Sequence, residues 1–265
     1  MTRTTWWTTL HLAAAVAACI SISYSASAAP IPISVSGLNA DLVVEASSTA
    51  PYSDDAEGFD IPNQWAYFET GLEGQAAGLP VDGEFNADGT GTEFDIADYS
   101  GDNALLLSSA TPSGVLTLDT PSQLASLHVL AVSTNGGGAG ALVVTYDDNS
   151  TMITDYAAPD WYGDISGSTT FSNAFSPAIQ GLGRIRLTDD LIDTPTGNPD
   201  LYETIIPLDS SKAVVSLEFT RAVTLNSANT STGIFALSGE VVPEPSTMAL
   251  LGLAGLGLVG WRFRR

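Results

Sequence analysis

The sequence predicts an all-β protein whose antiparallel strands form a β-sandwich. Short apolar and β-branched runs recur along the chain, bounded by clusters of Gly, Asp, Asn, Ser or Pro. No long segment with a helical period of 3.6 residues occurs outside the two termini. Hydrophobic residues make up 44% of the 265 residues, which is enough for a sizeable core. The lack of helices between strands argues against a parallel α/β fold.

The strands are expected at the apolar runs. In chain order these are 42–44, 104–107, 115–118, 127–132, 141–146, 184–187, 214–219 and 233–237. Val115 to Leu118 and Val215 to Phe219 alternate as half-buried strands do, whereas the continuous runs fit the interior of a sandwich. The glycines at 136–138 indicate a turn between two strands, and residues 147–150 indicate the tip of the following hairpin.

Charge and cysteine content exclude several classes of function. All 30 acidic residues, but only four basic ones, lie between Ala29 and Pro245, so this segment carries a net charge of about −26. Such a surface repels phosphate backbones and excludes nucleic acid as a partner. Cys19 is the only cysteine and lies in the N-terminal apolar stretch. The domain after it therefore has no internal disulfide, thiol nucleophile or cysteine-based zinc site.

Residues 1–28 are expected to be a signal peptide read by the Sec export machinery, with a helical apolar core. Arg3 gives a positive start, residues 10–22 form the apolar run, and Ala26 and Ala28 frame an A-x-A cleavage site. A competing interpretation is lipidation at Cys19, because the residues before it resemble a lipoprotein box.

The C-terminal segment 241–265 combines three features in order. Pro243, Glu244 and Pro245 come first, in a stretch that two prolines hold extended. Fourteen uncharged residues follow, reaching about 21 Å as a helix, and residues 246–263 together reach about 27 Å, close to the thickness of a bilayer core. An arginine cluster ends the chain and suits the cytoplasmic side of a short transmembrane helix; its members are Arg262, Arg264 and Arg265.

This order of features resembles the PEP-CTERM sorting signal of exported proteins in exopolysaccharide-producing Gram-negative bacteria. The resemblance implies anchoring in the inner membrane through the C-terminal helix. An exosortase would then recognise the chain at or near Pro243 to Pro245 and remove the tail, leaving the protein at the cell surface or outside the cell.

Residues 29–240 are expected to form one β-sandwich domain. Segments 79–85, 114–151, 158–163, 198–209 and 234–240 resemble bacterial jelly-roll domains of the galactose-binding type. That resemblance implies two antiparallel sheets packed face to face, with the first and last strands near each other. It also raises carbohydrate as a ligand, although the same fold serves many structural modules.

The predicted metal site is the stretch 84–95. Its oxygen-bearing side chains follow an EF-hand-like rhythm and comprise Glu84, Asn86, Asp88, Thr90 and Asp95. Structural calcium is therefore the one cofactor expected, but no helices flank the stretch, and an ordinary acidic hairpin turn is the alternative. Asp95, Asp98 and Asp102 form a second, looser acidic group.

The predicted sugar-binding residues are aromatic rings with polar neighbours: Asp160, Trp161, Tyr162 and Trp65. Rings stack on the C–H faces of sugars while carboxylates accept hydroxyl protons. The alternative is that both tryptophans pack in the core.

Catalysis is not expected. A serine triad would have to use His128, the only histidine outside the N-terminal segment, and its alternation with Leu127 and Val129 predicts a surface position. No Gly-x-Ser-x-Gly motif accompanies it. The sequence therefore predicts a non-enzymatic surface or extracellular-matrix protein that binds polysaccharide. A purely structural, adhesin-like module and, third, a secreted glycan-acting enzyme are the alternatives.

Overall fold

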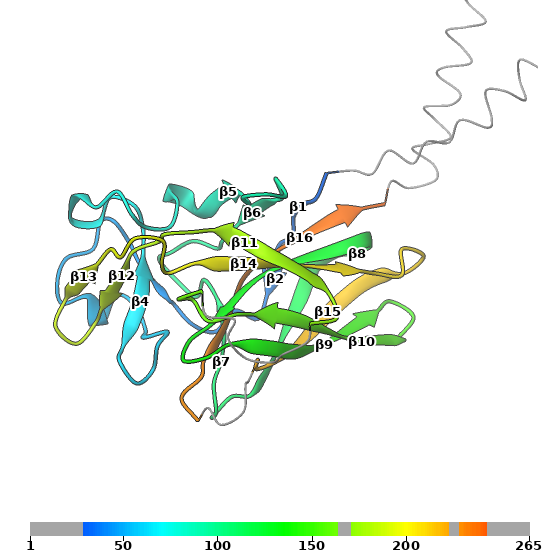
Figure 1. Cartoon of the computed structure of the whole chain (residues 1–265). Helices are drawn as coiled ribbons and strands as arrows, with labels where there is room; N and C mark the ends of the chain where they lie inside the picture. The colour runs from blue at the N-terminus through cyan, green and yellow to red at the C-terminus, as the bar shows by residue number, and fades with distance from the viewer. Residues whose placement is uncertain (1–28, 164–170, 223–227, 243–265) are drawn as a thin grey trace, which may run out of the picture.

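The computed structural model describes residues 29–163, 171–222 and 228–242 (Figure 1). The expected signal peptide, Cys19, the motif at Pro243 to Pro245, the apolar span and the arginine cluster lie outside these residues. Within them, regular structure consists of strands and three short 3₁₀ turns: η1 (Tyr52–Asp54), η2 (Leu72–Gly74) and η3 (Val81–Gly83). No helix in the described part of the chain is long and apolar enough to cross a membrane.

The strands form three sheets. The largest has the order β1-β16-β8-β15-β9-β10, with β2, β7, β11 and β14 paired beside this path. Its members are β1 (Ile31–Pro32), β2 (Val35–Ser36), β7 (Leu105–Leu107), β8 (Ser113–Ser133), β9 (Gly138–Tyr146), β10 (Thr151–Ala158), β11 (Ala174–Ile179), β14 (Leu201–Pro207), β15 (Ala213–Thr220) and β16 (Thr232–Val241). The four-stranded sheet contains β3 (Val43–Val44), β4 (Trp65–Phe68), β12 (Arg184–Arg186) and β13 (Leu191–Asp193), and the hairpin contains β5 (Glu84–Asn86) and β6 (Glu93–Asp95).

The all-β prediction is confirmed, and the curled antiparallel sheets are consistent with a β-sandwich and compatible with a jelly roll. The pairing departs from the expectation at β3 and β4, which run parallel. The alternating segments have the predicted sidedness: Leu116 and Leu118 are buried while Val115 is exposed, and Leu217 and Phe219 are buried while Glu218 is exposed.

β8 differs most from the prediction. The runs 115–118 and 127–132 were expected as two strands, but they are the two halves of one strand of 21 residues. The first half pairs with β15 and β2, and the second half pairs with β14 and β16. The polar residues between the two runs also belong to the strand. Along them β8 exchanges its first partners, β15 and β2, for its second partners, β14 and β16.

The second half of β8 is buried on both faces. Leu127, Val129 and Ala131 pack in one core, together with residues of β9 and β15. Leu130 and Val132, on the opposite face, pack in a second core with Trp161 and other aromatic residues. The continuous apolar run therefore serves two cores, one on each side of the sheet.

The two ends of the described domain lie side by side. Ile31 of β1 is paired with Gly239 of β16, and Pro32 with Ser238. Figure 1 shows β1 and the end of β16 meeting at one edge of the molecule, whereas β9 and β10 lie at the other end of the strand order. The expected proximity of the first and last strands is confirmed.

Only glycine fits at position 140, where β9 lies very close to residues of β10 and β15. A Cβ atom there would overlap the ring of Tyr156 and the carbonyl oxygen of Thr220. Tyr156 has no room to move, because it is fully buried, packs edge-on against Phe219 with ring centroids 5.2 Å apart and donates a hydrogen bond to Thr220.

We expect Gly140→Ala to lower the free energy of unfolding by about 1–3 kcal/mol through overpacking. Urea denaturation would measure the loss. Gly101→Ala is the matched control, since a Cβ at Gly101 meets open space. Equal stability of the two variants would contradict the packing described here.

Candidate functional site

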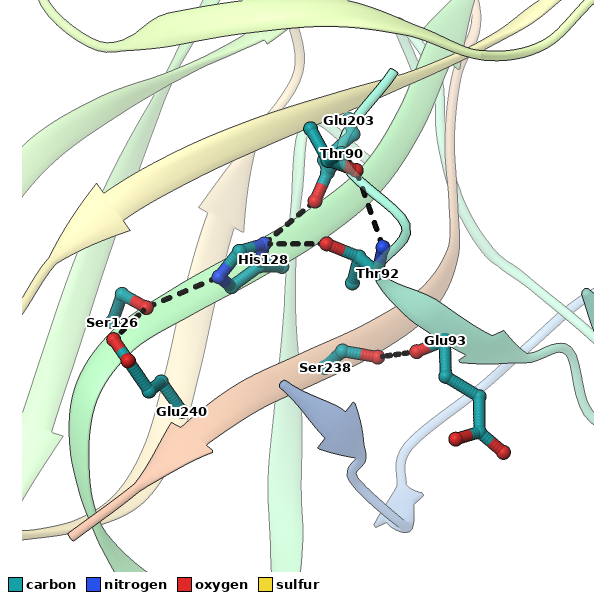
Figure 2. Close-up of polar contacts among 8 residues, drawn as sticks. All are labelled: Thr90, Thr92, Glu93, Ser126, His128, Glu203, Ser238 and Glu240. Atoms are coloured by element: carbon teal, nitrogen blue, oxygen red, sulfur yellow. Dashed lines mark hydrogen bonds and ion pairs between the residues drawn. The ribbon is translucent and has the colours of Figure 1, made fainter. Parts of the chain in front are cut away.

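A buried polar network centred on His128 is the main chemical feature of the large sheet (Figure 2). His128 lies in the middle of β8, with β14 on one side and β16 on the other. Glu203 of β14 reaches it along one ring edge, and Ser126 of β8 lies at the other. Thr90 and Thr92, from the turn of the β5–β6 hairpin, close the network from above the sheet.

The hydrogen bonds run in a continuous chain. His128 Nδ1 is 2.6 Å from Glu203 Oε1 and 3.2 Å from Thr92 Oγ1. His128 Nε2 is 3.1 Å from Ser126 Oγ, which donates to Glu240 Oε2 at 3.3 Å. Thr90 Oγ1 donates to the second carboxylate oxygen of Glu203 at 2.6 Å. The histidine therefore lies between two carboxylates, Glu203 directly and Glu240 through Ser126, and both ring nitrogens have partners.

The predicted surface position of His128 is wrong, since the residue is only 6% exposed. The predicted alternation holds in one respect, because His128 lies on the face of β8 opposite Leu127 and Val129. Its face of the sheet, however, also carries Leu130 and Val132, and it is covered by the β5–β6 hairpin. Two-sided burial of β8 turns an expected exterior position into an interior one.

Glu203 is fully buried, and its carboxylate is stabilised by the network. Burial alone would raise the pKa of Glu203, but hydrogen bonds from His128, Thr90 and Thr92 outweigh it and hold the pKa below the ordinary value of 4.5. The carboxylate is thus charged at neutral pH. Because a carboxylate only accepts hydrogen bonds, Nδ1 of His128 carries a proton.

Ser126, His128 and Glu203 have the connectivity of a hydrolytic triad, from hydroxyl to Nε2 and from Nδ1 to carboxylate. Their surroundings favour a different role. Ser126 is 9% exposed, and it lies on a strand paired with Pro207 on one side and Glu240 on the other. Its hydroxyl donates to Glu240. The network fits a clamp that holds the β5–β6 hairpin on the sheet.

The predicted sugar-binding residues come together around Arg184. The Arg184 guanidinium lies 4.1 Å from the ring centroid of Trp65, 4.4 Å from that of Tyr162 and 5.9 Å from that of Trp161. It is fixed by two hydrogen bonds to Asp193, at 2.9 and 2.8 Å. Ring faces that a sugar would need are therefore in contact with an arginine.

Both tryptophans are buried, Trp161 at 3% exposure and Trp65 at 8%. Trp161 packs edge-on against Phe59 and Tyr67, with ring centroids 5.3 Å apart in each case. Asp160, the residue before Trp161, joins two segments of backbone. One of its carboxylate oxygens accepts a hydrogen bond from the backbone N–H of Tyr162, and the other accepts one from the backbone N–H of Gly136. The ring contacts of Trp161 are typical of a hydrophobic core, and the hydrogen bonds of Asp160 are typical of a loop beside it.

The predicted calcium residues form the β5–β6 hairpin. Glu84 and Asp95 are direct cross-strand partners, Asp88 lies in the turn, and the hydroxyl of Thr90 is directed to Glu203. Asn86 pairs with Glu93. In the described ranges no group of three or more His, Cys, Asp or Glu side chains could hold a metal ion. Structural calcium at this hairpin stays a prediction.

Sequence reasoning missed Glu203 as the partner of His128. One signal is present, since a glutamate inside the mostly apolar run 201–207 needs a buried partner. The partner itself, however, follows from the pairing of β14 with β8, which no local pattern encodes.

Comparison with known families gives one match, in the C-terminal segment. Residues 241–265 match the PEP-CTERM protein-sorting motif. The match supports export of the chain and its sorting by an exosortase, with the protein anchored at the membrane before processing. The motif begins at Val241, which is also the last residue of β16. A comparison with curated proteins found no match.

We expect Glu203→Gln to lower the free energy of unfolding at pH 7 by about 3 kcal/mol, because it leaves buried partners of the carboxylate unsatisfied. The pKa of Glu203 is lowered by folding, so its contribution is fully present above pH 4.5 and is lost as the pH falls through the lower folded-state value. The difference in Tm between the two proteins should therefore shrink in acid.

Thermal denaturation at pH 7 and at pH 3 to 4 would measure this. Glu218→Gln removes an exposed carboxylate from β15 and is the control, with little change expected at either pH. A Glu203→Gln difference that is small at pH 7, or that grows in acid, would contradict the proposed clamp.

Proposed function

We propose that this protein is an exosortase substrate whose β-sandwich serves, without enzymatic activity, as a structural module at the cell surface or in the extracellular matrix of a Gram-negative bacterium. The Sec machinery exports it, a C-terminal span holds it in the inner membrane, and removal of that span releases or reattaches it. The observation that carries the proposal is the sorting motif that starts where β16 ends.

The geometry of the domain supports this role. Because β1 and β16 are paired, both chain ends leave the sandwich at one edge, so the domain is tethered at a single point. The opposite end of the large sheet, at β9 and β10, extends away from that tether. A module held in this way presents most of its surface to its surroundings.

Charge supports an extracellular setting. The four basic residues of the domain all have partners: Arg184, Arg186 and Lys212 pair with aspartates, and Arg221 donates to a backbone oxygen. The remaining carboxylates give a strongly anionic surface, which keeps the protein soluble and repels nucleic acid.

Intact-mass analysis of the protein recovered from its native host tests the sorting proposal. We expect a species that begins at residue 29 and has lost the apolar span after a cut near Pro243 to Pro245. Glu244→Ala should accumulate the uncut form, and Glu218→Gln should be processed normally. Recovery of the extracellular protein with residues 1–265 intact would contradict the proposal.

A fluorophosphonate probe tests whether Ser126 acts as the nucleophile of a serine hydrolase. Ser126 is expected to remain unlabelled in the folded protein, because it is buried and its hydroxyl donates a hydrogen bond to Glu240. Ser126→Ala serves as the control for background labelling. Labelling of the wild-type protein that disappears in Ser126→Ala would favour a secreted hydrolase instead.

A further inference from the structure

The outer face of the large sheet carries a row of hydroxyl side chains in register. Thr151 of β10 is paired with Thr145 of β9, which is paired with Ser216 of β15. Ser216 is paired in turn with Thr117 of β8, and Thr117 with Ser36 of β2. We call these five residues the hydroxyl ladder. Neighbouring strands lie about 4.8 Å apart, so the ladder is about 19 Å long.

The ladder faces outward. Its members are exposed or half-buried, and they alternate with inward residues such as Val144, Leu217 and Leu116, which are buried in the core. In the described structure none of the five hydroxyl groups makes a hydrogen bond to another protein group. Each hydroxyl has one donor and two acceptor lone pairs, so all five can donate to and accept from whatever lies on the row.

A second row runs beside the ladder and is mostly apolar. It consists of Ile153, Val143, Glu218 and Val115, paired across four of those five strands, from β10 to β8. Ile153 is 76% exposed, more than any other large hydrophobic residue described. Glu218 is the only charged residue in the two rows. In a chain with a net charge of −22, the two rows therefore hold a single charge, and the next positions on the same face of β8 and β10 are Asp119 and Asp155.

We propose that the hydroxyl ladder and its apolar row bind a neutral, hydroxyl-rich polysaccharide laid across the strands. Sugar hydroxyls can exchange hydrogen bonds with the ladder, while the methyl groups of Thr, Val and Ile contact the C–H faces of the rings. The inference rests on the proposed export, since it takes its ligand from outside the cell. It also gives the sandwich a ligand surface that is separate from the buried tryptophans.

Charge selects this occupant over two others. An anionic polymer would meet Glu218 and an acidic protein with no basic residue in either row, so it would be repelled. A second copy of the chain would bring another net charge of −22 to the interface. A neutral polymer suffers neither repulsion. The face reaches from β2 and β8 across β15 to β9 and β10, the end of the strand order opposite β1 and β16 (Figure 1).

Co-sedimentation of the full-length chain with insoluble polysaccharides tests the proposal. The probes are cellulose and a β-1,3-glucan as neutral polymers, and calcium-gelled alginate as an anionic one. We expect binding to at least one neutral probe and none to alginate. The double variant Thr145→Val/Ser216→Ala should bind about tenfold more weakly, since it removes two central hydroxyl groups and leaves the fold intact.

Thr188→Val, an exposed hydroxyl at the turn after β12, is the matched control and should bind like the wild type. An unchanged Tm in the double variant would show that folding is preserved. Absence of binding to both neutral probes, stronger binding to alginate, or equal binding by the double variant would overturn the proposal. So would sedimentation equilibrium showing a dimer that the double variant loses, which would assign the face to a second copy. None of these results depends on whether the C-terminal tail is removed, because the intact-mass experiment tests that separately.

Discussion

Burial of β8 on both faces is the constraint on which the rest of the architecture depends. In its second half, successive side chains enter two different cores, one shared with β9 and β15 and the other with the aromatic cluster around Trp161. The strand is also paired on both edges, with β14 and β16. A polar group placed there has no access to water, so each one needs a partner within the protein.

His128 and Glu203 meet that requirement together. The pair joins two neighbouring strands, and Thr90 and Thr92 extend it to a hairpin that shares no backbone ladder with them. A network of this kind favours one arrangement of three elements over alternatives in which a charge would be buried alone. The same geometry that resembles a catalytic constellation thus has a structural explanation in the layering of the fold.

The sequence predicted the features that depend on local pattern and missed those that depend on pairing. Alternation placed Leu116, Leu118, Leu217 and Phe219 inside correctly, because one face of those segments is exposed. The same rule failed at His128, because alternation cannot tell a solvated face from one that a distant hairpin covers. The sequence does not show that Arg184 lies against both Trp65 and Trp161, since only the fold brings it between them. The hydroxyl ladder was invisible for a related reason: its residues come from five strands, and register alone aligns them.

The pairing of β16 has a mechanical consequence. A pull on the tail enters the domain at Val241 and runs along the axis of β16, whose backbone is bonded to β8 from Thr232 to Val241. Hydrogen bonds perpendicular to such a load are sheared together and do not open one after another. A cell-wall or matrix component attached by this end would resist extension as a unit, with β8 distributing the force into both cores.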